Sequence, residues 1–180
     1  MTMTPKDPPS RGSVWRLIGW SLAALLLIIP LIAGQLTNEV RWSSFDFLLI
    51  GALLVSAGIA FEMIARGSQH WRYRLAAAAA VTAGFGTIVS NAAVGIIGSE
   101  HEPINLGFYA VPVLALAGAF IARFRALGMA VSMSLAAVGY LTLVMVGLLT
   151  GAPVGLFVIG PAVVWIGSAE LFRKAAESSS

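Results

Sequence analysis

Three ionisable residues, Glu100, His101 and Glu102, stand together between two apolar runs in the stretch "NAAVGIIGSEHEPINLGFY". Two carboxylates and an imidazole could bind a cation or transfer a proton. A structural zinc site commonly has four ligands, however, and calcium takes six to eight oxygens. Glu39 is the one further carboxylate that we expect at the same end of the helices as this turn and that is not explained as a helix cap below. The ligand count therefore favours a solvated turn between two helices, with a cation site as the alternative.

Asp46 and Glu102 have a simpler interpretation at the starts of helices. Ser43 and Asp46 have the spacing of a capping box, with Asp in place of the usual Glu. Glu102 precedes Pro103, and proline suits the first position of a helix. Both carboxylates would also interact favourably with the positive end of the helix dipole. Capping thus explains two of the acidic residues without any ligand.

Two further carboxylates, Glu62 and Glu170, lie inside apolar segments, where ionisable residues are candidates for function. Each is followed four residues later by a basic residue, Arg66 and Lys174 respectively. This order favours an ion pair on a helix. Because both carboxylates are near the end of their segment, we interpret them as interfacial pairs. A proton relay is the alternative.

Asn91 belongs to a series of small or polar residues spaced four apart, which keeps them close to one helix face. The series is Ala79, Ala83, Thr87, Asn91, Gly95 and Ser99. Small residues allow a second backbone to approach, and an asparagine can donate hydrogen bonds across the contact. The pattern favours tight helix packing over a ligand-binding stripe.

The elements that position these residues are predicted to be transmembrane helices. The chain has 180 residues, of which 58% are hydrophobic and 11% charged, too few charges for a soluble surface. The apolar runs do not alternate as barrel strands do, and each is near the length that spans a bilayer as a helix. We predict an all-α polytopic membrane bundle of about six helices. The predicted spans are Trp15–Gly34, Asp46–Ala65, Leu75–Gly98, Pro103–Ala122, Leu127–Thr150 and Val154–Phe172.

Basic residues give this arrangement an orientation. All but Arg41 of the 11 Lys and Arg residues fall on one side of the six-span arrangement. They are Lys6, Arg11, Arg16, Arg66, Arg72, Arg74, Arg123, Arg125, Arg173 and Lys174. The positive-inside rule then predicts that both termini are cytoplasmic. The charge asymmetry is explained by topology and needs no nucleic-acid partner.

We expect one transmembrane domain over residues 14–173, with a disordered cytoplasmic tail over 1–13 and a short polar tail over 174–180. A signal peptide is the alternative for the first span, but its apolar region is long and "LIAGQ" is a poor cleavage site. Proline interrupts three of the predicted spans, at Pro30, Pro112 and Pro161. Transporters use broken helices at binding sites, although proline is also frequent in ordinary membrane helices.

The segments "FDFLLIGALLVSAGIAFEMIARG", "NAAVGIIGSEHEPINL" and "IARFRALGMA" resemble a family of short, uncharacterised bacterial inner-membrane proteins. The resemblance covers about residues 36–135. It implies a compact helical bundle in the bacterial inner membrane. It implies no activity, cofactor or site residue.

No enzyme signature is present: the sequence has no HExxH motif, phosphate-binding loop or dinucleotide fingerprint, and no cysteine. His70 and His101 are predicted on opposite sides of the membrane. We therefore expect a non-catalytic membrane protein with an accessory, stress-response or outer-face sensing role, without cofactor or bound metal. Its expected partners are the lipid bilayer and either further copies of itself or other membrane proteins. The alternative is a small transporter or channel subunit that uses kinked helices and polar positions near Asn91.

Overall fold

The computed structural model describes residues 43–99, 101–155 and 158–178, together with Trp20, Ser21, Ala24, Leu25, Leu27, Ile28 and Ile32. Five α-helices lie within these residues: α2 (Ser44–Ala65), α3 (Trp71–Val94), α4 (Asn105–Ile121), α5 (Ala126–Leu149) and α6 (Ile159–Glu177). Extended pairing in this part of the chain is confined to an isolated bridge between Ile97 and Val154. The predicted all-α class is confirmed for the described residues.

Three helices are long and apolar enough to cross a membrane: Ser44–Ala65, Trp71–Ala93 and Ala126–Leu149. This identifies a membrane protein by length and composition. The described part of the chain thus holds fewer qualifying helices than the six predicted. Helix α4 is apolar but has 17 residues, and α6 ends in the charged sequence "ELFRKAAE". The first predicted span lies largely outside the described residues.

By its contacts the chain divides into two units, Met1–Gly58 and Ile59–Ser180. In the first unit, α2 begins with the expected capping box. Asp46 Oδ2 accepts hydrogen bonds from the Ser43 backbone N–H at 2.7 Å and from its hydroxyl at 2.8 Å. A Cβ atom added at Gly58 would lie 2.9 Å from the Trp20 ring. The glycine is therefore a close-packing position.

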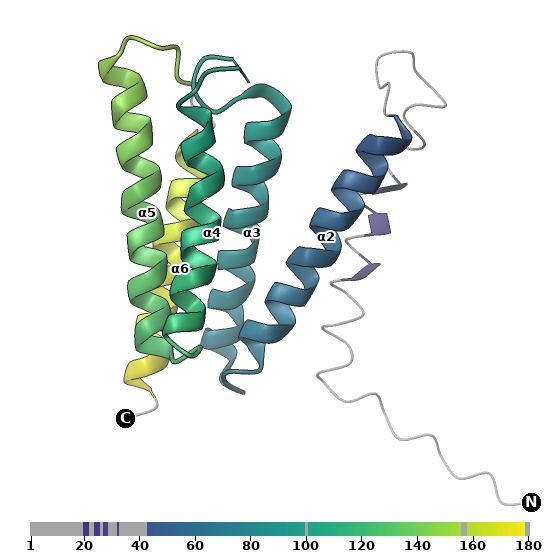
Figure 1. Cartoon of the computed structure of the whole chain (residues 1–180). Coiled ribbons are helices and arrows are strands. Elements are labelled where there is room, and N and C mark those ends of the chain that lie inside the picture. Colours follow the sequence, from purple (N-terminus) through teal and green to yellow (C-terminus); the bar gives the residue numbers. More distant parts are fainter. Residues whose placement is uncertain are drawn as a thin grey trace, which may run out of the picture. The chain divides into compact units, whose positions relative to one another are not determined.

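Helices α3 to α6 of the second unit form a four-helix bundle (Figure 1). Helix α3 contacts α4 and α6, and α5 contacts the same two helices, so the four close into a ring. The loops between successive helices are short, which makes neighbours antiparallel. The last two helices form the predicted hairpin, with Gly151 at φ 73°, but its connection is longer than the tight turn predicted from "TGAPVG", since α5 ends at Leu149 and α6 begins at Ile159.

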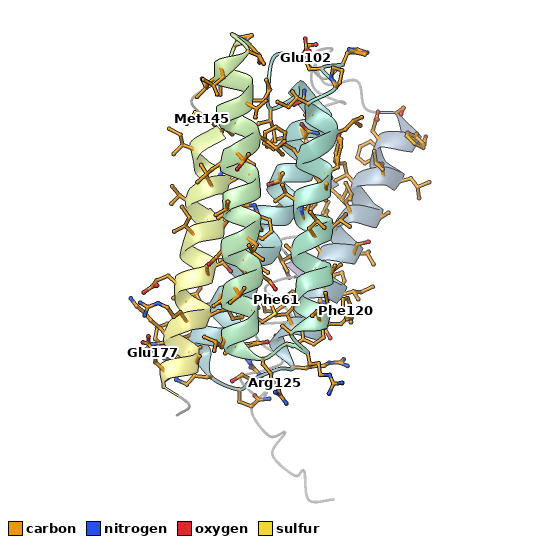
Figure 2. All side chains as sticks on the ribbon, turned by 60° about the vertical axis from the view of Figure 1, so that its left-hand side comes forward. Phe61, Glu102, Phe120, Arg125, Met145 and Glu177 are labelled. Carbon is orange, nitrogen blue, oxygen red and sulfur yellow. The ribbon has the colours of Figure 1, made fainter. Side chains whose placement is uncertain are left out.

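Large aromatic side chains fill the bundle interior. Trp165, Tyr73, Tyr140, Phe108 and Phe172 are all buried. The Phe108 and Tyr140 rings pack edge to face with their centroids 5.1 Å apart. The Tyr73 and Phe172 rings do the same at a centroid distance of 4.9 Å. The outer surface carries exposed Leu, Val, Ile and Phe side chains along α4, α5 and α6 (Figure 2). An apolar exterior around a filled core suits a lipid environment.

Some helix limits differ from the predicted ones. Helix α3 ends four residues early because Gly95, at φ 69°, takes a left-handed conformation that few other residues adopt. Helix α6 continues to Glu177, which makes four residues of the predicted polar tail helical. Pro161 does not interrupt a helix, since it lies in the first turn of α6, where no intrahelical bond to its nitrogen is lost. Pro112 does lie inside α4, as predicted.

The small-residue face of α3 packs inward, as predicted. Ala83, Thr87 and Asn91 are buried. A Cβ atom added at Gly84 would lie 3.3 Å from Cβ of Pro112, and the Trp165 ring would be 3.8 Å away. A Cβ at Gly86 would meet no atom within 4 Å. Gly84 therefore lies at a close contact with α4, and Gly86 does not.

Gly84→Leu is expected to lower the free energy of unfolding in detergent by about 1–3 kcal/mol, because the side chain would overpack the contact with Pro112. Gly86→Leu, two residues away on the same helix, is the matched control. It should change the free energy of unfolding by about 0.5 kcal/mol or less. SDS titration of both variants measures the difference. Equal stabilities would contradict the packing described for α3.

Candidate functional site

Two buried asparagines hold the turn between α3 and α4. Asn91 is in the last turn of α3, and Asn105 is the first residue of α4. The Asn91 Nδ2 donates to the backbone oxygen of Asn105 at 2.8 Å, and its Oδ1 accepts from the Ile96 backbone N–H at 3.4 Å. Asn91 therefore joins the end of one helix to the start of the next.

Asn105 satisfies the backbone of the turn itself. Its Oδ1 accepts from the Ile97 N–H at 3.0 Å, and its Nδ2 donates to the Ile97 oxygen at 3.0 Å. The same Nδ2 donates to the Ser99 oxygen at 2.6 Å. One side-chain amide thus pairs with three backbone groups. We call these bonds of Asn91 and Asn105 the asparagine network.

The turn is also fastened to the loop between α5 and α6. The Gly98 N–H donates to the Pro153 oxygen at 3.0 Å, beside the bridge between Ile97 and Val154. The Ile97 side chain is buried against α5, where a Cβ atom added at Gly147 would lie 2.8 Å from it. Both loops at this end of the bundle are therefore one connected structure.

This arrangement tests the predicted role of Asn91. The prediction that its amide bonds a neighbouring helix is confirmed by the contact with Asn105. Each polar side-chain atom of both asparagines has at least one protein partner. Both side-chain amides bond backbone groups of the turn, so the geometry indicates a structural function more than a ligand site.

The ionisable residues of the opening motif lie above this network. His101 and Glu102 are exposed in the turn, while Glu100 lies outside the described residues. Glu102 is at the end of the bundle opposite to Arg125 and Glu177 (Figure 2). Its backbone oxygen accepts the Asn105 N–H at 2.9 Å, and α4 starts at Asn105 and not at the predicted Pro103. The residue before α4, Ile104, provides no side-chain cap, so the predicted capping by Glu102 is wrong.

Metal binding finds no support in the residues that the structure describes, where no group of three or more His, Asp or Glu could hold an ion. The remaining carboxylates are engaged locally. Glu62 pairs with Arg66 at 3.7 Å, as predicted. Glu170 pairs with Lys174 at 3.5 Å, as predicted, and more closely with Arg173 at 2.7 Å.

Two buried side-chain polar atoms of the described residues have no hydrogen-bond partner. The Tyr140 hydroxyl on α5 and the Trp165 Nε1 on α6 are buried and have no protein hydrogen-bond partner in the described part of the chain. Nothing in the spacing of the sequence predicted this pair. A buried polar atom of this kind commonly marks a bound water or a functional group.

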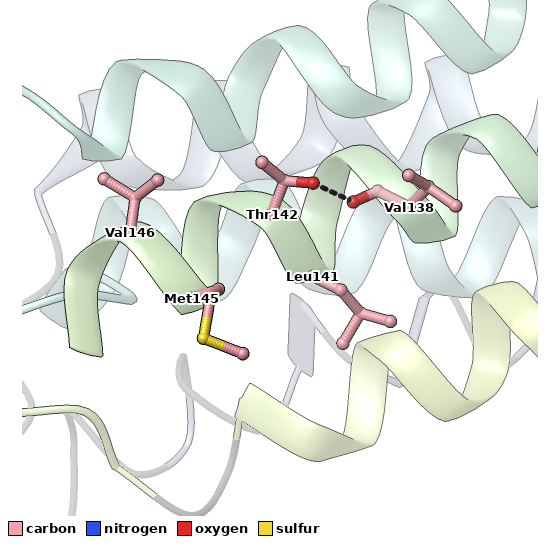
Figure 3. Close-up of a pocket in the computed structure, with 5 residues that line it drawn as sticks. All are labelled: Val138, Leu141, Thr142, Met145 and Val146. Atoms are coloured by element: carbon pink, nitrogen blue, oxygen red, sulfur yellow. Dashed lines mark hydrogen bonds between the residues drawn. The ribbon is translucent and has the colours of Figure 1, made fainter. Parts of the chain in front are cut away.

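A shallow apolar groove on α5 faces outward (Figure 3). Its lining residues are Val138, Leu141, Thr142, Met145 and Val146. The Thr142 hydroxyl donates to the Val138 oxygen at 2.8 Å, so it offers little polarity to the groove. This surface suits lipid chains.

Sequence reasoning did not assign the role of Asn105. The signal was present, because a polar amide at the start of an otherwise apolar helix is placed where unpaired backbone groups gather. The partner could not be identified from spacing, since the bonds to Ile97 and Ser99 depend on how the turn folds back. No protein-family model, curated protein or solved structure matches the chain.

Asn105→Leu is expected to lower the free energy of unfolding by at least about 2 kcal/mol, because two buried backbone groups of Ile97 and the part-buried oxygen of Ser99 lose their partner. Asn105→Asp should be similarly destabilising, since its second oxygen would face two carbonyl oxygens. Asn91→Leu should cost about 0.6 kcal/mol, with about 1.7 as an upper value. Ser99→Ala is the control, because Ser99 contributes its backbone oxygen. Thermal or SDS unfolding in detergent measures the stability of all four variants. An Asn105→Asp protein as stable as the parent would contradict the network.

Proposed function

We propose that the chain is a non-catalytic, six-span protein of the bacterial inner membrane that acts as an accessory, stress-response or outer-face sensing component. The observation that carries the proposal is the asparagine network, which uses the most conspicuous polar groups of the bundle for its own architecture. Aromatic side chains fill the space below it. A bundle closed in this way supports a scaffold more than a conduit.

The charge distribution supports the proposed orientation. The arginines of the first turn of α3 and of the loop before α5 are assigned to the cytoplasmic side, together with both termini. The turn with His101 and Glu102 would then face outward. Both residues are exposed in that turn, which fits a sensing role on the outer face. The proposed partners are lipids, further copies of the chain or other membrane proteins, and no nucleic acid.

A small transporter or channel subunit is the second candidate, and one observation favours it. The Tyr140 hydroxyl and the Trp165 Nε1 are unpartnered inside the bundle. Pro112 also removes one intrahelical bond from α4. Buried polar atoms near a proline-interrupted helix are the parts from which transporters build binding sites.

Reconstitution separates the two candidates. Proteoliposomes containing the purified chain should show the same flux of ions and small metabolites as protein-free liposomes, because the bundle interior is filled. Flux above that background, reduced by Tyr140→Phe but not by Thr142→Val on the outer groove, would establish the transporter instead. Dye-loaded vesicles with a panel of ions give the measurement.

The orientation is tested with reporter fusions. Fusions after Arg74, Arg125 and Lys174 should report a cytoplasmic position, because basic residues flank all three. Insertion at Glu102 should report the outside. A cytoplasmic signal at Glu102 would rule out the six-span arrangement.

A further inference from the structure

Two sequence triplets of the same pattern, arginine–aromatic–arginine, meet at one end of the bundle. "RYR" at 72–74 begins α3, and "RFR" at 123–125 forms the turn between α4 and α5. The Tyr73 hydroxyl donates to the Phe124 backbone oxygen at 2.5 Å. This one hydrogen bond joins the centres of the triplets, so the four flanking arginines belong to two segments that are in contact. We call this arrangement the double-triplet site.

The backbone of the second triplet is held in an uncommon conformation. Arg123 and Phe124 have φ angles of 49° and 57°, in the left-handed region that few non-glycine residues occupy. The Phe124 N–H donates to the Ala119 oxygen at 3.1 Å, and the Phe124 ring meets Phe120 edge to face at 5.2 Å. Strained backbone that the surroundings hold in place is typical of functional sites. Here it fixes a turn from which two exposed arginines project.

Other basic residues at this end have carboxylate partners. Arg66 pairs with Glu62 at 3.7 Å. Arg173 and Lys174 pair with Glu170 at 2.7 Å and 3.5 Å. These cations are compensated within the protein, so they contribute little to the binding of an external anion.

The four arginines of the triplets are not compensated in this way. Within the described residues no ion pair joins Arg72, Arg74, Arg123 or Arg125 to a carboxylate. Arg74 donates to two neutral oxygens, and Arg72 lies over the Trp71 ring at 5.5 Å. Four arginines at this end of the bundle therefore carry a positive charge that no carboxylate of the described residues balances through an ion pair.

We propose that the double-triplet site binds the phosphate of an anionic phospholipid headgroup. Guanidinium groups match phosphate oxygens with paired hydrogen bonds, which ammonium groups cannot do. The site is at the ends of α3 and α4, which would be at the depth of headgroups if these helices span the membrane as proposed. Trp71 beside it is 62% exposed, as expected of an aromatic residue at the interface. Basic sites between helix ends bind such lipids in other membrane proteins. The inference rests on the membrane location in the proposed function and not on the role proposed there.

Native mass spectrometry of the purified full chain, with equal amounts of phosphatidylglycerol and phosphatidylcholine of the same acyl chains, tests the proposal. The parent should retain the anionic lipid preferentially. Arg123→Gln/Arg125→Gln should reduce the preference by about fivefold for each arginine removed. Arg66→Gln/Arg173→Gln removes the same charge from paired positions and should leave the preference nearly intact.

The proposal would be overturned by no preference in the parent, by an equal loss in both double variants, or by displacement of the lipid by inorganic phosphate at equal concentration. The last would make a soluble anion the occupant. Tyr73→Phe gives an independent test if the arginine variant does not fold. It keeps all four charges and removes only the hydroxyl that joins the triplets, so it should cause a smaller loss of preference. An unchanged preference in a folded Tyr73→Phe protein would also contradict the site.

Discussion

The hydrogen bonds of Asn105 to the turn before α4 are the interaction on which the rest of the bundle depends. A membrane helix that ends and reverses leaves backbone N–H and C=O groups that need partners where water is scarce. Asn105 supplies partners to Ile97 and Ser99, and Asn91 ties the same turn to α3. The two amides thus replace the helical bonds that the N–H groups of Ile96 and Ile97 give up after the helix ends.

The rest of this end of the bundle follows from that turn. Because the turn is fixed, the Ile97 side chain can lie against Gly147 and its backbone can pair with Val154. The opposite end uses the same device, a side-chain group bound to a loop carbonyl, in the bond from Tyr73 to Phe124. Between the two ends, the Ser168 hydroxyl donates to the Ala76 oxygen at 2.9 Å and joins α6 to α3. Polar side chains therefore brace a core that is otherwise apolar.

Features set by residues close in sequence were predictable. The capping box of Asp46 and the ion pairs of Glu62 and Glu170 follow from spacings of three or four residues, and the structure confirms them. The inward face of α3 follows from helical periodicity. The partners of Asn105 and the meeting of Tyr73 with Phe124 were not predictable, because they depend on tertiary contacts between loops. The early end of α3 was missed because an apolar run continues past Gly95. The hydropathy of a segment carries no information on the positive φ angle of a glycine.

Hydrogen exchange at the backbone amides of Ile96 and Ile97 tests the central claim most directly. Both N–H groups donate to asparagine side chains and not to helical carbonyls. If the asparagine network closes the bundle, these amides should exchange in detergent as slowly as amides in the middle of α3. Exchange at the rate of an open loop, with α3 still protected, would show that the turn is not held and would contradict the account.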